Sequence, residues 1–194
     1  MRTTESTTNT TVAGRLEFLA SRPARRVAAV VSFAVLTAIS AKVALPIPGT
    51  AVPFTFQTLA MILAGALLGA QLGAASQILY LTLGVIGVPV FAGPIAGAAY
   101  LMGPTGGYLI AAPLAAWVTG RLMGSSMLRN FGALLVGLAA IYAGGLSWLA
   151  VQTQWSTAFS VGLLPFFLAD MGKLAVATLV VGRLRDHTRS LFGV

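Results

Sequence analysis

The sequence lacks cysteine and has few charged residues. No cysteine occurs in its 194 residues, which excludes disulfides, thiolate metal sites and a cysteine nucleophile. Charged residues make up only 8% of the chain, whereas soluble domains carry about 25%. This composition excludes an ordinary soluble globular domain and is typical of a protein that lies largely within a membrane.

Sequence signatures of an enzyme are also missing. The chain has no G-x-x-x-x-G-K-[ST] segment, so it does not hydrolyse ATP through a P-loop. Its one histidine, His187, lies in a basic C-terminal stretch, and no Ser–His pair or metal-ligating cluster can be placed in the apolar segments. We therefore predict that the protein is not an enzyme and holds neither a metal nor a cofactor.

Long hydrophobic runs dominate what is present. Hydrophobic residues make up 57% of the chain, and the mean hydropathy is +0.90. Continuous runs predict membrane-spanning helices, whereas a membrane β-barrel would show short alternating segments. Six runs are predicted to span the membrane, at 27–45, 54–69, 72–88, 108–123, 131–151 and 163–181. The expected fold class is all-α integral membrane with six transmembrane helices.

The positive charges predict the orientation of these helices. With six spans, every arginine falls on one side, which is the cytoplasmic side by the positive-inside rule. Both termini are then cytoplasmic, and the partner of the apolar surface is the lipid bilayer. We predict a basic, disordered N-terminal tail over 1–25, a membrane domain over 26–185 and a cytoplasmic tail over 186–194. The net charge of +8 reflects this orientation and does not predict nucleic-acid binding.

Two irregular segments interrupt the predicted helices on the outer side. Proline occurs three times within 46–53, and 89–107 is apolar but rich in glycine and proline. Neither segment can form a simple helix. Irregular backbone at membrane depth survives only where protein or a water-filled cavity satisfies its hydrogen bonds. Both segments are therefore candidate walls or lids of a cavity.

Asp170 and Lys173 are the most informative charged residues. They lie within the last apolar run, and their spacing places them on one face of a helix. An ionisable group at bilayer depth costs roughly 2.5–3.5 kcal/mol. Three interpretations stay open: an internal ion pair that fixes helix packing, a site for a polar solute, and a proton relay through Asp170.

Other polar and aromatic residues have alternative interpretations. Lys42 reaches the outer surface by snorkelling or acts as a counter-ion for a ligand carboxylate. Gln57 is expected near the outer rim, whereas Gln77 is typical of helix–helix hydrogen bonding. Tyr80, Phe91 and Tyr108 stack on a ligand or belong to the core.

Small residues recur at four-residue spacing. Gly65, Gly69 and Gly73 form one such ladder, and Ala34 and Ala38 form another. Ladders of small residues let helices approach closely. Internal packing explains them most simply, although the ladder on the first span is also suited to docking a partner subunit.

The order of several motifs resembles a known family. The runs are VPFTFQTLAMILAGALLG (52–69), LYLTLGVIGVPVFAG (79–93), GPTGGYLIAAP (103–113) and DMGK (170–173). Together they resemble BioY, the biotin-specific substrate-binding S component of energy-coupling-factor (ECF) transporters, over residues 27–185. The resemblance implies a six-helix S-component fold in a bacterial-type cytoplasmic membrane. It also implies a transmembrane coupling subunit and two cytoplasmic ATPase subunits as partners.

The resemblance assigns roles to several residues. Asp170 and Lys173 would hold the polar part of biotin, and Ala34 and Ala38 would face the coupling subunit. Some members carry a polar side chain where this chain has Ala92 and Gly93, so backbone groups near Gly93, or Tyr80, would complete the ureido contacts. The candidate binding residues are Asp170, Lys173, Lys42, Gln57, Tyr80, Phe91, Gly93, Thr105 and Tyr108.

Three functional hypotheses follow. The first is high-affinity biotin capture as the substrate-specific subunit of an ECF transporter. The second is a solitary carrier that couples uptake to protons through Asp170. The third is a structural membrane subunit without a ligand. Whether Lys173 or Lys42 meets the biotin carboxylate stays open.

Overall fold

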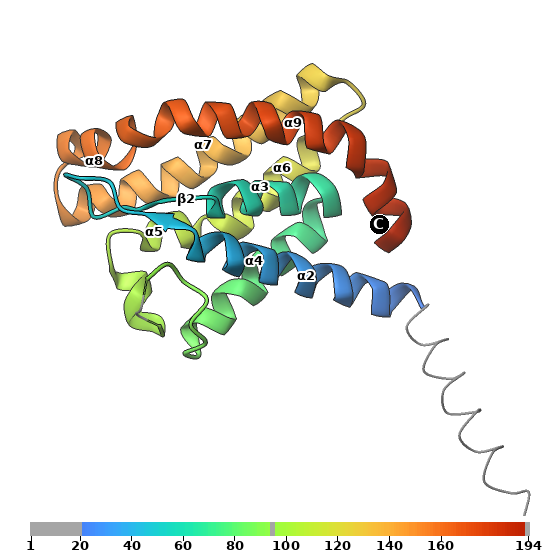
Figure 1. The fold of residues 1–194 in the computed structure, drawn as a ribbon, viewed down its shortest axis with the longest axis horizontal. Coiled ribbons are helices and arrows are strands. Elements are labelled where there is room, and N and C mark those ends of the chain that lie inside the picture. Colours follow the sequence, from blue (N-terminus) through green and yellow to red (C-terminus); the bar gives the residue numbers. More distant parts are fainter. Residues whose placement is uncertain (1–20, 94–95, 193–194) are drawn as a thin grey trace, which may run out of the picture.

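The chain folds into a bundle of helices with a short strand pair at one end (Figure 1). The computed structural model describes residues 21–93 and 96–192. The elements are α2 (Arg22–Lys42), β1 (Ala44–Leu45), β2 (Phe54–Thr55), α3 (Gln57–Leu68), α4 (Ala70–Val85), η1 (Ala98–Met102), α5 (Gly106–Ile110), α6 (Ala112–Leu122), α7 (Met127–Gln152), α8 (Trp155–Gly162) and α9 (Leu164–Phe192). Each of the six predicted runs corresponds to one of these helices or to the consecutive pair α5 and α6.

The helices run back and forth along the long axis of the molecule. One end carries the start of α2, the α3–α4 turn, the α6–α7 connection and the end of α9 (Figure 1). The opposite end carries β1, β2, the segment between α4 and α5, and α8. The two irregular segments therefore lie at the same end, as predicted.

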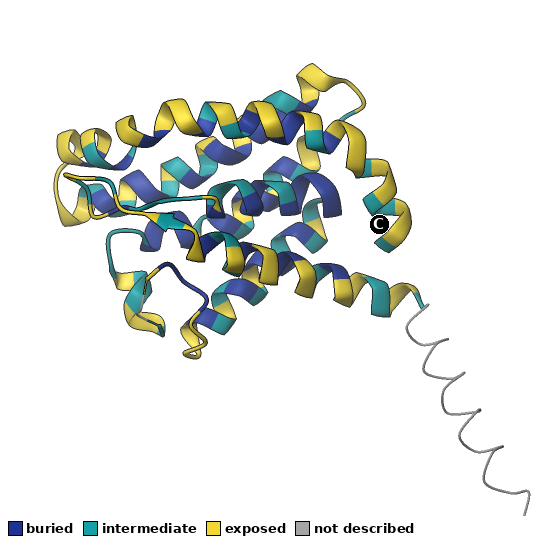
Figure 2. Ribbon diagram, in the orientation of Figure 1, coloured by how far each residue is buried: buried dark blue, intermediate teal, exposed yellow. Residues whose placement is uncertain are grey.

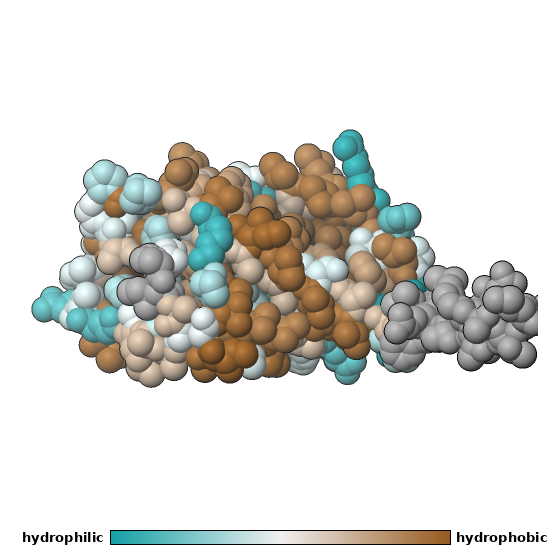
Figure 3. Space-filling model, turned by 60° about the horizontal axis from the view of Figure 1, so that its bottom comes forward, coloured by the Kyte–Doolittle hydropathy of each residue, from teal (hydrophilic) through white to brown (hydrophobic). Residues whose placement is uncertain are grey.

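Three helices are long and apolar enough to cross a membrane, namely α2, α7 and α9, and α3 is a shorter apolar helix. Many large apolar side chains face outward, including Val27 at 62%, Ile39 at 59% and Leu168 at 83% exposure. Figure 2 shows exposed residues along the outer sides of the helices, and Figure 3 shows a broad hydrophobic band along one face. Exposed apolar surface of this extent is expected of a membrane protein.

Two helix boundaries differ from the prediction. Ser21 caps α2 by accepting a hydrogen bond from the Ala24 amide at 3.4 Å, and Pro23 fits the first turn, so α2 begins at Arg22. At the other end, α9 continues through the predicted C-terminal tail to Phe192. Of the disordered tail predicted over 1–25, residues 1–20 lie outside the described residues, whereas residues 22–25 belong to α2.

Glycines bring α3, α4 and α6 into close contact. Gly69 joins α3 to α4 with φ +80°, a conformation that favours glycine. A methyl group at Gly65 would lie 1.9 Å from the Ala116 carbonyl oxygen of α6. A methyl group at Gly73 would lie 2.6 Å from the Gly65 Cα. The ladder therefore serves internal packing around the turn between α3 and α4.

A buried hydrogen-bond network joins α2 to α4. Gln77 and Thr37 are fully buried, and the Gln77 amide nitrogen donates to the Thr37 hydroxyl at 3.2 Å. The same nitrogen donates to Ser76 at 3.1 Å, and Thr37 donates to the Phe33 carbonyl at 2.8 Å. The interpretation of Gln77 as a helix–helix contact is confirmed.

We predict that Gly65→Ala destabilises the bundle. The added methyl group meets backbone of α6, which cannot move aside as a flexible side chain would. Overpacking of this kind costs about 1–3 kcal/mol, so the melting temperature in detergent should fall by several degrees. Gly132→Ala in α7 is the matched control because its methyl group would point into open space. Equal melting temperatures for the two variants would contradict the packing role of Gly65.

Candidate functional site

Asp170 and Lys173 form an ion pair on the inner face of α9. Lys173 Nζ lies 2.8 Å from Asp170 Oδ1, and the side chains are only 9% and 5% exposed, respectively. The spacing of three residues places both side chains on one face of the helix. Burying such a pair is favourable only where further hydrogen bonds satisfy both groups.

Neighbouring elements supply those further contacts. Lys173 Nζ donates to the Thr55 carbonyl of β2 at 2.6 Å and lies 4.0 Å from the centre of the Phe54 ring. The Tyr142 hydroxyl of α7 donates to Asp170 Oδ2 at 2.5 Å. The ion pair therefore joins α9 to β2 and α7. The ammonium–ring contact is a cation–π interaction.

Both charged groups keep unused hydrogen-bonding capacity. An ammonium has three donors, and Lys173 uses two of them within the described residues, toward Asp170 and Thr55. A carboxylate offers about four lone-pair sites, and Asp170 accepts two hydrogen bonds in the described part of the chain. A ligand beside the pair can therefore both donate to Asp170 and accept from Lys173 without breaking the existing contacts.

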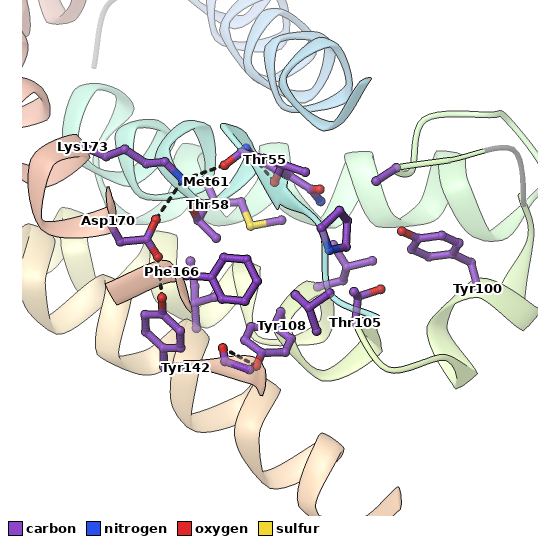
Figure 4. A pocket seen from close by; sticks show the side chains of 17 residues that line it. Thr55, Thr58, Met61, Tyr100, Thr105, Tyr108, Tyr142, Phe166, Asp170 and Lys173 are labelled. Atoms are coloured by element: carbon purple, nitrogen blue, oxygen red, sulfur yellow. Dashed lines mark hydrogen bonds and ion pairs between the residues drawn. The ribbon is translucent and has the colours of Figure 1, made fainter. Parts of the chain in front are cut away.

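A cavity lies beside this pair (Figure 4). It contains about 620 Å³ of empty space, part of which is open to solvent. It is lined by Val52, Pro53, Thr55, Gln57, Thr58, Met61, Ala92, Tyr100, Thr105, Tyr108, Leu109, Ile141, Tyr142, Gly162, Phe166, Asp170 and Lys173.

Polar groups gather at the two ends of the cavity. Figure 4 shows Asp170, Lys173 and Tyr142 at one end, Tyr100 and Thr105 at the other, and Phe166 and Tyr108 between them. Tyr108 is held in place by its hydroxyl, which donates to the Gly162 carbonyl at 2.9 Å. The site therefore suits an elongated ligand with an apolar middle and a polar group at each end.

The uncharged end of the cavity continues into an outer groove. This groove, with about 950 Å³ of empty space, shares Pro53, Ala92, Tyr100 and Thr105 with the cavity. Both irregular segments line it, and its name follows the orientation that the sequence predicts. Burial raises the pKa of the Tyr100 phenol, so Tyr100 stays neutral at physiological pH. The groove therefore joins the cavity to the end of the bundle that carries the strand pair.

Five of the predicted binding residues line the cavity, namely Asp170, Lys173, Gln57, Thr105 and Tyr108. Tyr80 and Phe91 do not line the cavity. Both are fully buried, their rings meet edge to face at 5.6 Å, and the Tyr80 hydroxyl accepts a hydrogen bond from Gln57 at 2.9 Å. Gly93 lines the outer groove instead of the cavity.

Lys42 does not reach the cavity. Its ammonium donates to the Phe91 carbonyl at 2.7 Å and to the Gly93 carbonyl at 3.3 Å, while most of the residue is exposed. Lys42 thereby links the end of α2 to the segment that borders the outer groove. Its snorkelling to the surface and its contact with a ligand carboxylate both stay predictions.

The structure also locates the proposed docking pair. Ala34 is 1% exposed, and Ala38 is partly buried against the core. Helix α2 packs mainly against α4 and α3, and both alanines belong to its packed side. The docking role of Ala34 and Ala38 stays a prediction.

Sequence reasoning missed five lining residues with polar or aromatic character, namely Thr55, Thr58, Tyr100, Tyr142 and Phe166. Tyr142 is the most consequential because it binds Asp170 directly. Its only signal is a phenol in the middle of a long apolar run. Such a group generally finds a hydrogen-bond partner when it is buried, but the sequence does not identify the partner.

Comparisons with known proteins point to one family. A profile of the BioY family matches residues 7–190. The chain is 41% identical over 165 residues to the probable biotin transporter BioY of Pyrococcus horikoshii, a match that covers 85% of this chain and 99% of that protein. It is 37% identical over 156 residues to the biotin transporter BioY of Thermotoga maritima, which covers 79% and 91%, respectively.

A solved structure has a similar fold. It is the crystal structure at 2.1 Å of the S-component for biotin from an ECF-type ABC transporter. The two chains share 27% sequence identity and superpose with a TM-score of 0.76, over 83% of this chain and 90% of the other.

Proposed function

The chain belongs to the BioY family, and we propose that it binds biotin in the cavity between α3, α7 and α9 for uptake across the membrane. The observation that carries this proposal is the ion pair of Asp170 and Lys173 at one end of an otherwise apolar cavity. The same observation favours a ligand site over a merely structural pair, because both groups keep hydrogen-bonding capacity toward the cavity.

The chemistry of biotin suits the two ends of the cavity. Its ureido ring has two N–H donors and one carbonyl, its thioether ring is apolar, and its valerate chain ends in a carboxylate. We propose that the ureido ring lies beside the ion pair, with an N–H donating to Asp170 and the carbonyl accepting from Lys173. A carboxylate at that end would face the like charge of Asp170. The valerate chain then extends toward Thr105 and Tyr100.

In this orientation neither Lys173 nor Lys42 contacts the biotin carboxylate. Lys173 is assigned to the ureido carbonyl, and Lys42 is occupied by the carbonyls of Phe91 and Gly93. The carboxylate is instead placed near the Tyr100 phenol and the outer groove, where water can solvate it. Phe166 and Tyr108 would cover the apolar thioether ring from the sides of the cavity.

We further propose six membrane spans with both termini in the cytoplasm and the biotin cavity toward the outside. Supporting this orientation, the described arginines belong to the start of α2, the ends of α6 and α9, and the start of α7. These parts share one end of the bundle (Figure 1). The cytoplasmic membrane of a bacterial-type cell is the proposed location, because positive residues mark its cytoplasmic face.

The proposed energy source is an ECF module of one transmembrane coupling subunit and two cytoplasmic ATPase subunits. The solved relative is an S-component from an ECF-type ABC transporter, which supports this assignment. The alternative is a solitary carrier that couples biotin uptake to protons through Asp170. The two mechanisms differ in whether this chain alone can concentrate biotin.

We predict that biotin binds saturably to the purified protein and that Asp170→Asn and Lys173→Met each weaken binding about 100-fold or more. Each change leaves the other member of the ion pair and a ureido group without a partner, and a buried unpaired group costs about 1–3 kcal/mol or more if charged. Isothermal titration calorimetry measures the affinity. Asp186→Asn and Arg183→Gln are matched controls at the opposite end of the molecule and should bind like the parent protein. Unchanged binding in both cavity variants would refute the proposed site.

We predict that blocking the ureido N–H groups weakens binding far more than removing the carboxylate charge. The N–H groups are assigned to the buried ion pair, whereas the carboxylate is assigned to the solvated end. Calorimetry with N-methylated biotin and with biotin methyl ester compares the two ends directly. We expect losses of about 100-fold for the first and about tenfold or less for the second. The opposite ranking would reverse the proposed orientation while leaving the cavity assignment intact.

We predict that proteoliposomes with this chain alone do not concentrate biotin when a proton gradient is imposed. Accumulation of radiolabelled biotin that follows the gradient and disappears with a protonophore would establish the solitary, proton-coupled alternative. Reconstitution with an ECF module and ATP should restore accumulation. A Lys173→Met chain that fails under both conditions serves as the control for uptake through the cavity.

A further inference from the structure

A second hollow lies at the end of the bundle opposite the biotin cavity. We call it the arginine groove, and it is lined by Arg26, Leu68, Ala70, Gln71, Leu72, Trp117, Gly120, Arg121, Met123, Arg185 and Arg189. The groove contains about 1310 Å³ of empty space, against about 620 Å³ in the biotin cavity. The biotin mechanism makes no use of this space.

The arginine groove is strongly positive. Its four guanidinium groups come from α2, α6 and α9. The only acidic residues in the described part of the chain are Asp170, which lies in the biotin cavity, and Asp186, which lies beside Arg185 on α9. Burial and the neighbouring guanidinium groups of Arg189 and Arg129 lower the pKa of Arg185, and Asp186 only partly offsets this. The described residues of the groove therefore carry more positive than negative charge.

Two of these arginines keep buried donors without a partner. Among the described residues, no group accepts a hydrogen bond from the Nε atoms of Arg185 and Arg189, although both atoms are shielded from solvent. Arg185 is held in place because its Nη1 donates to the Gly124 carbonyl. The Arg189 guanidinium reaches Gly69 at the α3–α4 turn. Buried donors are nearly always satisfied, so this arrangement calls for acceptor oxygens from outside the described residues.

Apolar residues flank the positive groups. Leu68, Leu72 and Met123 line the groove, and Trp117 lies there with 45% of its surface exposed. Tryptophan is enriched where the hydrocarbon of a membrane meets the headgroups. The groove thus offers phosphate-binding guanidinium groups next to surface that suits acyl chains. An anionic phospholipid combines these two chemistries in one molecule.

We propose that the arginine groove binds the phosphate headgroup of an anionic phospholipid from the cytoplasmic leaflet. The inference rests on the orientation proposed above but not on the identity of the transported ligand. Guanidinium groups pair with phosphate oxygens through two parallel hydrogen bonds, and basic pockets between helices on the cytoplasmic side are suited to anionic headgroups. The acyl chains extend along the exposed face near Trp117.

Native mass spectrometry of the full chain in detergent tests the proposal by titration with phosphatidylglycerol. Phosphatidylcholine with the same acyl chains is the control lipid because its headgroup has no net charge. We expect saturable, salt-sensitive binding of phosphatidylglycerol only. The variant Arg121→Gln/Arg189→Gln should weaken it about tenfold or more, since each arginine near an anionic leaflet contributes roughly fivefold.

The matched control is Arg22→Gln/Arg183→Gln, which removes the same charge at the same end from exposed residues that do not line the groove. It should bind phosphatidylglycerol like the parent protein. Circular dichroism verifies the fold of both double variants. Should the groove variant unfold, Arg121→Gln alone, with an exposed side chain, carries the test against Arg183→Gln and should weaken binding about fivefold.

Four outcomes would overturn the proposal. Equal weakening in the groove and control variants would mean that only net charge attracts the lipid. Equal binding of phosphatidylcholine would remove the requirement for an anionic headgroup. Displacement of the lipid by millimolar inorganic phosphate would identify a free-anion site. Tighter binding of a hexaglutamate peptide at the same arginines would identify a protein-docking site.

Discussion

The ion pair of Asp170 and Lys173 depends on partners from elements far away in the sequence. Thr55 and Phe54 reach Lys173 from the strand pair, and Tyr142 reaches Asp170 from α7. Two buried charges on one helix would be costly without these contacts. These contacts hold the strand pair, α7 and α9 in one arrangement. The contacts of the ion pair therefore also determine the shape of the cavity that these elements enclose.

The two ends of the bundle are packed through different kinds of contact. At the end where α3 meets α4, glycines such as Gly65 and Gly73 let the backbones of α3, α4 and α6 meet. At the end that carries the strand pair, aromatic rings fill the space between the elements, with Phe91 stacked on Tyr100 at 4.8 Å. The cavity thus lies at the end that is packed mainly through side chains.

The features that the sequence predicts best are those that carry a large free-energy cost. Asp170 and Lys173 stand out because charge is expensive at membrane depth, and the helices stand out because their apolar runs are long. Tyr142 does not stand out, since a phenol fits an apolar run and only the fold reveals its partner. The contact of Lys42 with the carbonyls of Phe91 and Gly93 is likewise invisible in the sequence, because it depends on how an irregular loop folds back.

The contacts of Lys42 couple the position of α2 to that of the segment beside the cavity. Its ammonium holds the end of α2 against the carbonyls of Phe91 and Gly93, and the residue between them, Ala92, belongs to both the cavity and the outer groove. A rigid helix that slides along its axis moves its end as far as its middle. Displacement of α2 along its axis would therefore also move the segment around Ala92, because Lys42 links the two.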